Sequence, residues 1–232
     1  MNPNAQPADL AIPQKYLPDG VGREQQQELL DILWMKLLFG GDPDFDHLVD
    51  YICDYPFFSE DGTGRELPAI SQADAEELAE FLINTRIAQQ ATFAGGGEGG
   101  EVSAPGVPSF RNPLSSAFEE IRRHGIVAAE NFTCCNTCGH EEIYTQVPRE
   151  GDWRAYVFFH QQDVENIFEY GEGGLSFGAL QDISDKELTE LISEVVLPIL
   201  HKHNIHAEWN NSLDSRIQLR DITLYYPLKW KS

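Results

Sequence analysis

Long apolar runs are absent from this sequence. No segment approaches the roughly 18 to 20 consecutive apolar residues that cross a bilayer. The opening stretch, MNPNAQPADLAIPQKYLPDG, also lacks the basic and apolar regions of a secretory signal. These absences argue against a membrane-spanning or secreted protein, and we expect a soluble, cytoplasmic protein without a membrane partner.

Basic residues are scarce as well. Lys and Arg number 16 against 38 Asp and Glu, so the formal net charge is -22. Because such a surface repels phosphate backbones, we do not expect nucleic-acid binding. Excess carboxylates favour solubility or a basic protein partner, and both remain expectations.

Cysteine is the third scarce feature. The chain has four cysteines, and Cys134, Cys135 and Cys138 lie close together in the segment NFTCCNTCGHEE. Two adjacent cysteines form a poor disulfide framework, because a cross-link needs separated partners. The sequence therefore predicts reduced thiols.

What the chain does contain is enough apolar material for a folded core. Hydrophobic residues make up 41% of the 232 residues and aromatic residues 11%, so disorder is not the expected state. Pro-rich residues 1–23 are predicted to form a flexible leader. Residues 24–93 are expected to be helical, residues 94–109 to form a Gly/Pro-rich linker or insertion, and residues 110–232 to form an α+β domain.

Helices are predicted where apolar residues recur every three to four positions. Three are expected before the linker, near residues 24–39, 43–54 and 72–91, with Asp42 capping the second and Ser71 the third. After the linker, a fourth helix ends in basic residues and Gly125. The longest helix of the C-terminal half opens with the capping box Ser184–Glu187, and Pro198 is expected to bend it.

Segments rich in β-branched and aromatic residues predict about five strands. They are residues 126–129, 154–160, 174–180, 205–210 and 216–230, the last two forming an antiparallel hairpin. The expected fold class is therefore α+β, with a helical N-terminal part followed by a mixed sheet packed with helices. We expect Phe158 and Phe177 to share one core with Leu191 and Val195.

The cysteine segment leaves three interpretations open. Cys135 and Cys138 have the Cys-x-x-Cys spacing that supplies half of a zinc site, and His140 or His160 could complete it. Cys134 should diverge from its neighbour. The same pair could act as a redox dithiol, but the adjacent glutamates should raise rather than lower the thiol pKa. The third interpretation is packing, in which case no cofactor is expected.

A second candidate location is the segment FFHQQD. His160 ends a predicted buried strand, and Asp163 could cap the helix that follows. If a catalytic site exists, we expect Cys135, Cys138, His160 and Asp163 to share it. The histidines at 201, 203 and 206 are explained by a helix C-terminus without a metal.

Two strings carry a resemblance. The motif NFTCC-x-x-CG, at Asn131–Gly139, and the string YVFFHQQD, at Tyr156–Asp163, resemble an uncharacterised bacterial family catalogued as a domain of unknown function, DUF6891-like. The resemblance covers roughly residues 30–220, and the Gly-rich stretch 94–109 is an addition to its pattern. It implies an intact fold and carries no activity over to this chain.

Two functional hypotheses follow. The first is a non-catalytic protein-interaction module that neutralises a basic toxin or effector, because the charge is -22 and no convincing catalytic constellation is visible. The alternative is a small metal- or thiol-dependent enzyme centred on Cys135, Cys138 and His160, favoured by their clustering.

Overall fold

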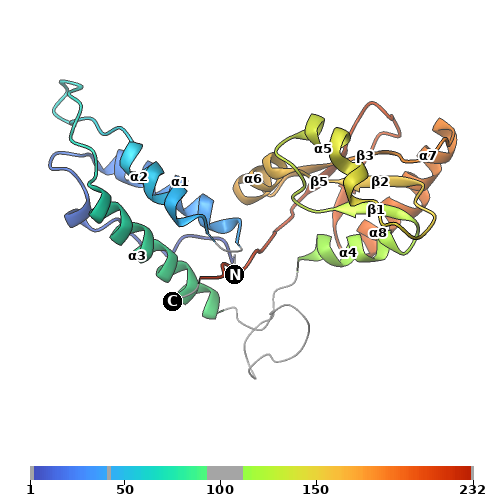
Figure 1. Cartoon of the computed structure of the whole chain (residues 1–232), viewed down its shortest axis with the longest axis horizontal. Helices are drawn as coiled ribbons and strands as arrows, with labels where there is room; N and C mark the ends of the chain where they lie inside the picture. The colour runs from blue at the N-terminus through green and yellow to red at the C-terminus, as the bar shows by residue number, and fades with distance from the viewer. Residues whose placement is uncertain (1–2, 41–42, 93–111, 231–232) are drawn as a thin grey trace. The chain divides into compact units, whose positions relative to one another are not determined.

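The computed structural model describes residues 3–40, 43–92 and 112–230, and the chain divides into two compact units (Figure 1). A helical unit comprises residues 1–110 with 225–232, and an α+β unit comprises residues 111–224. The predicted fold class, α+β with a helical N-terminal part, is confirmed. The predicted linker, 94–109, lies outside the described residues.

The helical unit is built from α1 (Arg23–Leu38), α2 (Phe45–Asp54) and α3 (Gln72–Ala91), preceded by the short η1 (Gln14–Tyr16). Ser71 caps α3 as predicted, with its hydroxyl accepting a hydrogen bond from the Asp74 amide. The cap of α2 is Asp44 rather than Asp42, since the Asp44 carboxylate accepts from the His47 amide at 3.1 Å. Asp42 itself lies outside the described residues.

Residues 3–22, which belong to the segment 1–23 predicted as a flexible leader, pack in the helical unit. Although apolar side chains are sparse there, four of them are buried: Ile12, Tyr16, Leu17 and Val21. The Trp34 indole donates to the Asn4 carbonyl at 2.9 Å, and the Arg86 guanidinium donates to the Pro3 carbonyl at 2.6 Å. The segment is therefore held by isolated buried side chains and hydrogen bonds, which do not produce a periodic pattern in the sequence.

The end of the chain also departs from expectation. The predicted strand over residues 216–230 stops at Arg220, and residues 225–230 pack in the helical unit. Leu228 exchanges two hydrogen bonds with the Gln90 side chain, at 2.6 and 3.0 Å. Fully buried Arg86 lies between the rings of Trp34 and Tyr225, and its burial lowers its pKa to about 10.

The α+β unit contains the predicted sheet, in the strand order β1-β2-β3-β5-β4. Its elements are α4 (Pro113–Arg122), β1 (Ile126–Ala129), α5 (Asn136–Glu142), η2 (Ile143–Gln146), β2 (Ala155–Phe158), α6 (Gln161–Tyr170), β3 (Gly173–Ala179), α7 (Asp185–Leu191), η3 (Ile192–Val196), α8 (Leu197–Lys202), β4 (His206–Glu208) and β5 (Ile217–Arg220). β1 and β2 are parallel and the other pairs are antiparallel, so the sheet is mixed.

Helices cover both faces of this sheet (Figure 1). On one face Tyr156 and Phe158 pack with Ile143, beside α5. On the other face Phe159 meets Phe118 of α4, with ring centroids 5.7 Å apart. The two faces therefore have separate apolar clusters.

The prediction that Phe158 and Phe177 share one core is wrong. Phe158 pairs with Ser176, whereas Phe177 pairs with Val157. Residues directly opposite one another lie on the same face, and successive residues alternate, so the two rings face opposite sides of the sheet. Phe177 instead meets Trp209 edge to face, at 5.3 Å between centroids.

The long C-terminal helix is interrupted by a π-helical turn, η3, which ends two residues before Pro198. The Leu197 amide bonds to the Ile192 carbonyl, five residues back, so the turn holds one extra residue. Val196 is consequently buried and Val195 is only half-buried, contrary to the predicted stripe. The capping box of Ser184 and Glu187 is confirmed.

Candidate functional site

The cysteine segment lies at an edge of the sheet where two loops meet. It follows β1, and His160 follows the parallel neighbour β2, so both loops leave the carboxyl ends of parallel strands. Two backbone hydrogen bonds join the loops: the Phe132 amide donates to the Phe159 carbonyl at 2.9 Å, and the Gln161 amide donates to the Thr133 carbonyl at 3.1 Å. The edge therefore holds both candidate segments.

The backbone before the thiols is strained. Asn131 and Thr133 have φ values of 46° and 60°, in the left-handed region that β-branched residues rarely adopt. The Thr133 hydroxyl donates to the Cys135 carbonyl at 3.1 Å, which holds the turn closed. Strain of this kind costs about 1–3 kcal/mol and clusters at functional sites, so the turn supports a functional interpretation of the loop.

This turn brings three thiols together. The Sγ of Cys138 lies 3.6 Å from the Sγ of Cys134 and 3.6 Å from the Sγ of Cys135, and all three sulfurs lie within 4.8 Å of one another. Cys134 is exposed, whereas Cys135 and Cys138 are half-buried. Cys135 and Cys138 approach each other as predicted, but Cys134 joins them instead of diverging.

The electrostatics of the thiols also differ from expectation. Hydrogen bonds from the Cys138 amide and thiol, and from the Cys134 thiol, lower the pKa of Cys135. Hydrogen bonds with the thiols of Cys134 and Cys135, together with the charges of both groups, raise the pKa of Cys138 to about 12. The side chains of Glu141 and Glu142 are exposed on α5, and the pKa of Cys135 is lowered, contrary to the sequence argument.

Two contacts position α5, the helix that carries Cys138. The Ser176 hydroxyl of β3 hydrogen-bonds the Asn136 side chain at the first residue of the helix. Gly139 lies against the Phe158 ring so closely that an added Cβ would fall 2.2 Å from a ring carbon. The residue after Cys138 is therefore glycine for a steric reason, and the ring sets the height of the helix above the sheet.

His140 is turned away from the sulfurs. Its Nδ1 lies 2.7 Å from the Tyr156 hydroxyl, and its ring meets Phe158 edge to face at 5.2 Å. Burial lowers its pKa, and the positive charge of Arg216 lowers it further. Although His140 was a candidate ligand, it is not part of the thiol cluster among the described residues.

His160 and Asp163 form the N-terminal cap of α6. Here His160 is the capping residue and Asp163 occupies the third helical position, rather than capping the helix itself. The Asp163 carboxylate accepts from the amides of His160 and Gly174, both at 3.1 Å, and forms an ion pair with Arg216. Burial lowers the pKa of His160, partly offset by Asp163. Neither residue joins the thiol cluster.

The structure thus brings Cys135 and Cys138 together with Cys134, whereas the candidate side chains of His140, His160 and Asp163 have their hydrogen-bond partners elsewhere. Sequence reasoning missed Cys134 as a site residue, because adjacent side chains in an extended chain point in opposite directions. It also missed Arg216 and Ser176, which are far away in sequence. No spacing pattern in the sequence could have indicated those two residues.

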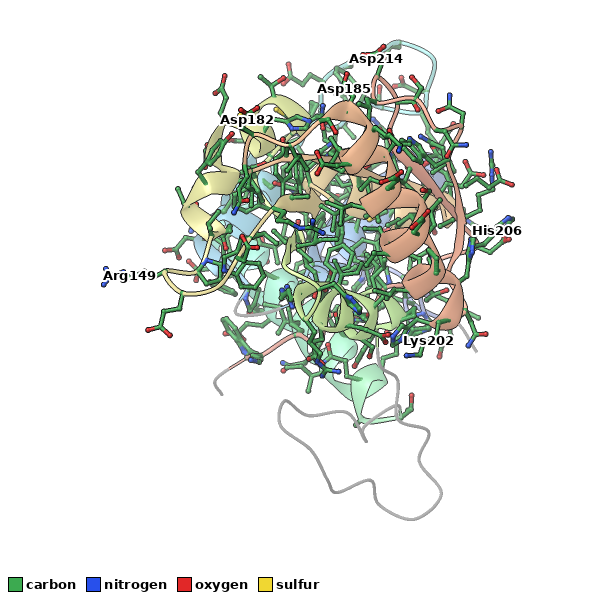
Figure 2. The ribbon with its side chains drawn as sticks, turned by 90° about the vertical axis from the view of Figure 1, so that its right-hand side faces the viewer. Arg149, Asp182, Asp185, Lys202, His206 and Asp214 are labelled. Carbon is green, nitrogen blue, oxygen red and sulfur yellow. The ribbon has the colours of Figure 1, made fainter. Side chains whose placement is uncertain are left out.

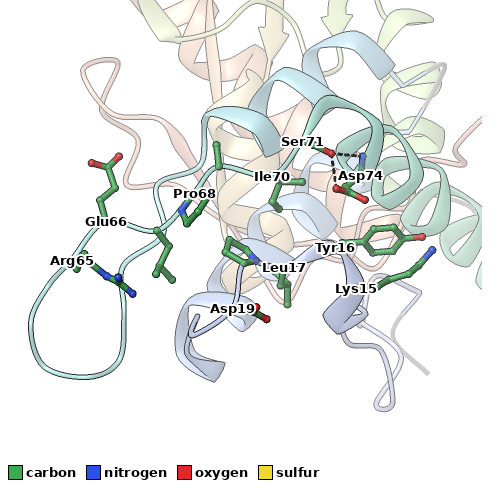
Figure 3. A pocket seen from close by; sticks show the side chains of 13 residues that line it. Lys15, Tyr16, Leu17, Asp19, Arg65, Glu66, Pro68, Ile70, Ser71 and Asp74 are labelled. Carbon is green, nitrogen blue, oxygen red and sulfur yellow. Dashed lines mark hydrogen bonds between the residues drawn. The ribbon is translucent and has the colours of Figure 1, made fainter.

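Besides the cysteine cluster of the α+β unit, the chain contains a hollow in the helical unit. It has a volume of about 790 Å³ and is lined by the segment around Tyr16 and by residues 65–71 (Figure 3). Two of its polar side chains have local partners: Lys15 pairs with Glu77 at 2.9 Å, and Ser71 with Asp74. These paired side chains already have partners, so the hollow is a weaker candidate for a binding site than the three thiols.

Comparison with known proteins places the site inside a recognised family. The family described as "Domain of unknown function (DUF6891)" matches residues 109–225, just over half of the chain, and this range includes every residue of the site. No curated protein and no solved structure matches the chain. No helix in the described part of the chain combines the length and apolarity needed to cross a membrane.

Proposed function

The chain belongs to the DUF6891 family, a domain of unknown function, and we propose that its α+β unit binds one thiophilic metal ion through Cys134, Cys135 and Cys138. The observation that supports this function is the convergence of three sulfurs within 4.8 Å. A single disulfide engages only two thiols, and the packing interpretation does not require the sulfurs to lie close together. A metal site accounts for all three.

The sulfur separations suit a single ion. Thiolates bound to Zn²⁺ at about 2.3 Å in a tetrahedron lie roughly 3.8 Å apart. Two of the three separations here are 3.6 Å, so only small side-chain rotations are needed. Three soft sulfur donors favour zinc or monovalent copper over magnesium or calcium, which prefer oxygen. Zinc remains the ion that the Cys-x-x-Cys spacing first indicated.

The fourth coordination position decides what such a site does. Among the described residues no histidine, carboxylate or further cysteine joins the three sulfurs, and Cys134 is exposed. Structural zinc sites are closed by four protein ligands, whereas sites with three keep a position for water or substrate. An open fourth coordination position supports metal exchange. It is also compatible with the alternative function, an enzyme centred on Cys135, Cys138 and His160.

We expect the reduced full-length protein to bind one Zn²⁺ per chain. Replacing Cys135 by Ser should weaken binding by at least about 100-fold, because loss of outer-shell partners alone costs about 10- to 100-fold. Anaerobic titration against a chromophoric chelator measures both values. Cys53→Ser is the matched control, because Cys53 lies in the helical unit, with its thiol 3.7 Å from the Gln72 side chain. The zinc affinity of this variant should equal that of the parent. Equal zinc affinity of the Cys135→Ser variant and the parent would refute the proposal.

Interaction with a basic protein partner is the second candidate, supported by the net charge of -22. Acidic side chains such as Asp182, Asp185 and Asp214 are exposed and project outward from the α+β unit (Figure 2). Electrostatic steering by such charges accelerates association and is screened by salt. A cytoplasmic location fits both candidates, because a reducing compartment keeps thiols free.

For this candidate we expect a partner with net positive charge whose association rate falls steeply as salt is raised. Replacing Asp182, Asp185 and Asp214 together by Asn should slow association and leave dissociation nearly unchanged. Surface plasmon resonance at low and high salt measures both rates. An association rate that is insensitive to salt and to the triple substitution would remove charge as the basis of recognition.

A further inference from the structure

The three thiols do not stand in equivalent positions. Cys138 lies 3.6 Å from each of the other two sulfurs. Cys134 and Cys135 are adjacent in sequence, so their Cα atoms are about 3.8 Å apart. Disulfides normally span about 4.4–6.8 Å between Cα atoms. A bond between Cys134 and Cys135 is therefore disfavoured, and any unstrained disulfide within the cluster must include Cys138.

We propose that, without bound metal, the cluster is a thiol–disulfide exchange site in which Cys138 is the pivot shared by two alternative disulfides, Cys134–Cys138 and Cys135–Cys138. The substrate class is a small accessible disulfide of the glutathione type. This inference uses the same cysteines as the proposed metal site, but it concerns the metal-free protein and does not depend on metal binding.

The difference in solvent exposure among the three thiols indicates the order in which they react. Cys134 is the exposed thiol, so its thiolate attacks the external disulfide, forming a mixed disulfide and releasing one substrate thiol. The Cys138 thiolate then attacks the Cys134 sulfur and releases the second substrate thiol. In total, the substrate disulfide gains two electrons and two protons, and two protein thiols lose them to form one disulfide.

The last step moves the disulfide inward. The Cys135 thiolate attacks the Cys138 sulfur, which forms Cys135–Cys138 and returns Cys134 to the thiolate. The Cys135 and Cys138 sulfurs must approach from 3.6 Å to the bonded distance of about 2.05 Å. Because both residues are half-buried, the inner disulfide is less accessible to attack than the outer one.

The fold is suited to this chemistry. The Cys-x-x-Cys pair lies between two parallel strands joined through α5, a strand–helix–strand arrangement in which such a pair is typical of thiol redox proteins. The strained turn at Thr133 holds Cys134 beside the pivot. Substrate access requires no opening of the core, since the first thiol is already at the surface.

The test uses metal-free full-length protein incubated with glutathione disulfide, followed by alkylation and peptide mass spectrometry. We expect one internal disulfide in the parent and in the Cys53→Ser control. Cys135→Ser should still form one, as Cys134–Cys138. Cys134→Ser should form Cys135–Cys138 much more slowly than the parent forms its disulfide, because this variant lacks the exposed thiol that reacts first. Cys138→Ser should form none and should retain glutathione as a mixed disulfide on Cys134.

An internal disulfide in the Cys138→Ser variant, or a parent that forms Cys134–Cys135, would overturn the pivot. So would failure of the Cys135→Ser variant to form a disulfide while its circular dichroism remains that of the parent. A Cys134→Ser variant that forms its disulfide as fast as the parent would overturn the order of events. These two variants keep the test decisive if Cys138→Ser does not fold. Zinc titration of reduced protein is a separate measurement, so failure of metal binding and failure of exchange are distinguished.

Discussion

Replacing Phe158 by Ala is expected to lower the free energy of unfolding of the α+β unit by about 3–5 kcal/mol, the usual cost of removing a buried aromatic ring. Phe158 is the last residue of β2, and its side chain is fully buried. Its ring contacts Phe132, Tyr156 and His140, with centroids 6.1, 6.1 and 5.2 Å away. The resulting cavity would lie directly beneath α5.

Urea denaturation followed by circular dichroism measures this loss. Tyr170→Ala is the matched control, because Tyr170 is 66% exposed in the same unit and its loss should change stability by less than about 0.5 kcal/mol. Phe158→Ala should also weaken zinc binding, since Gly139 rests on the ring next to Cys138. A destabilisation below about 1 kcal/mol would mean that this face of the sheet is not a packed core.

The second large effect is expected at Asp163, whose replacement by Ala should cost about 3–5 kcal/mol. The carboxylate is buried and accepts from two amides, those of His160 and Gly174, besides pairing with Arg216. Removing it leaves the Arg216 charge without its anion and both amides without an acceptor. One substitution therefore disturbs α6, β3 and the start of β5.

A double-mutant cycle separates these contributions. Replacing Arg216 by Leu in the Asp163→Ala background should cost less than replacing it in the parent, with a coupling energy of at least about 1 kcal/mol. Asp182→Ala provides the control, because Asp182 is exposed in the same unit. Additive effects of the two changes would show that the ion pair does not contribute to stability.

Local signals predicted most of the secondary structure. Helix α3 was located from its serine cap and apolar period, and the capping box at Ser184 located the start of α7. Four of the five described strands lie within the predicted segments, and β3 begins one residue before the segment predicted over 174–180. These predictions succeeded because caps and periodicity act between residues three or four positions apart, where the sequence itself specifies the geometry.

The missed elements depend on distant partners. Residues 3–22 and 225–230 are ordered by contacts with α1 and α3, such as those of Arg86 with Pro3 and Tyr225. The face on which Phe177 lies depends on strand register, since a shift of one residue exchanges the two faces of a strand. Neither property is encoded in a local window.

For the candidate site, the sequence by itself determined which residue types were present: three thiols within five positions, followed by a histidine, with a second histidine and an aspartate after the next strand. Tertiary structure alone decided how they are used. Cys134 joins its neighbours because Thr133 adopts a left-handed conformation, held by a hydrogen bond from Gln161 of the adjacent loop. His160 and Asp163 are instead committed to capping α6 and holding Arg216, because burial requires each polar group to find a partner.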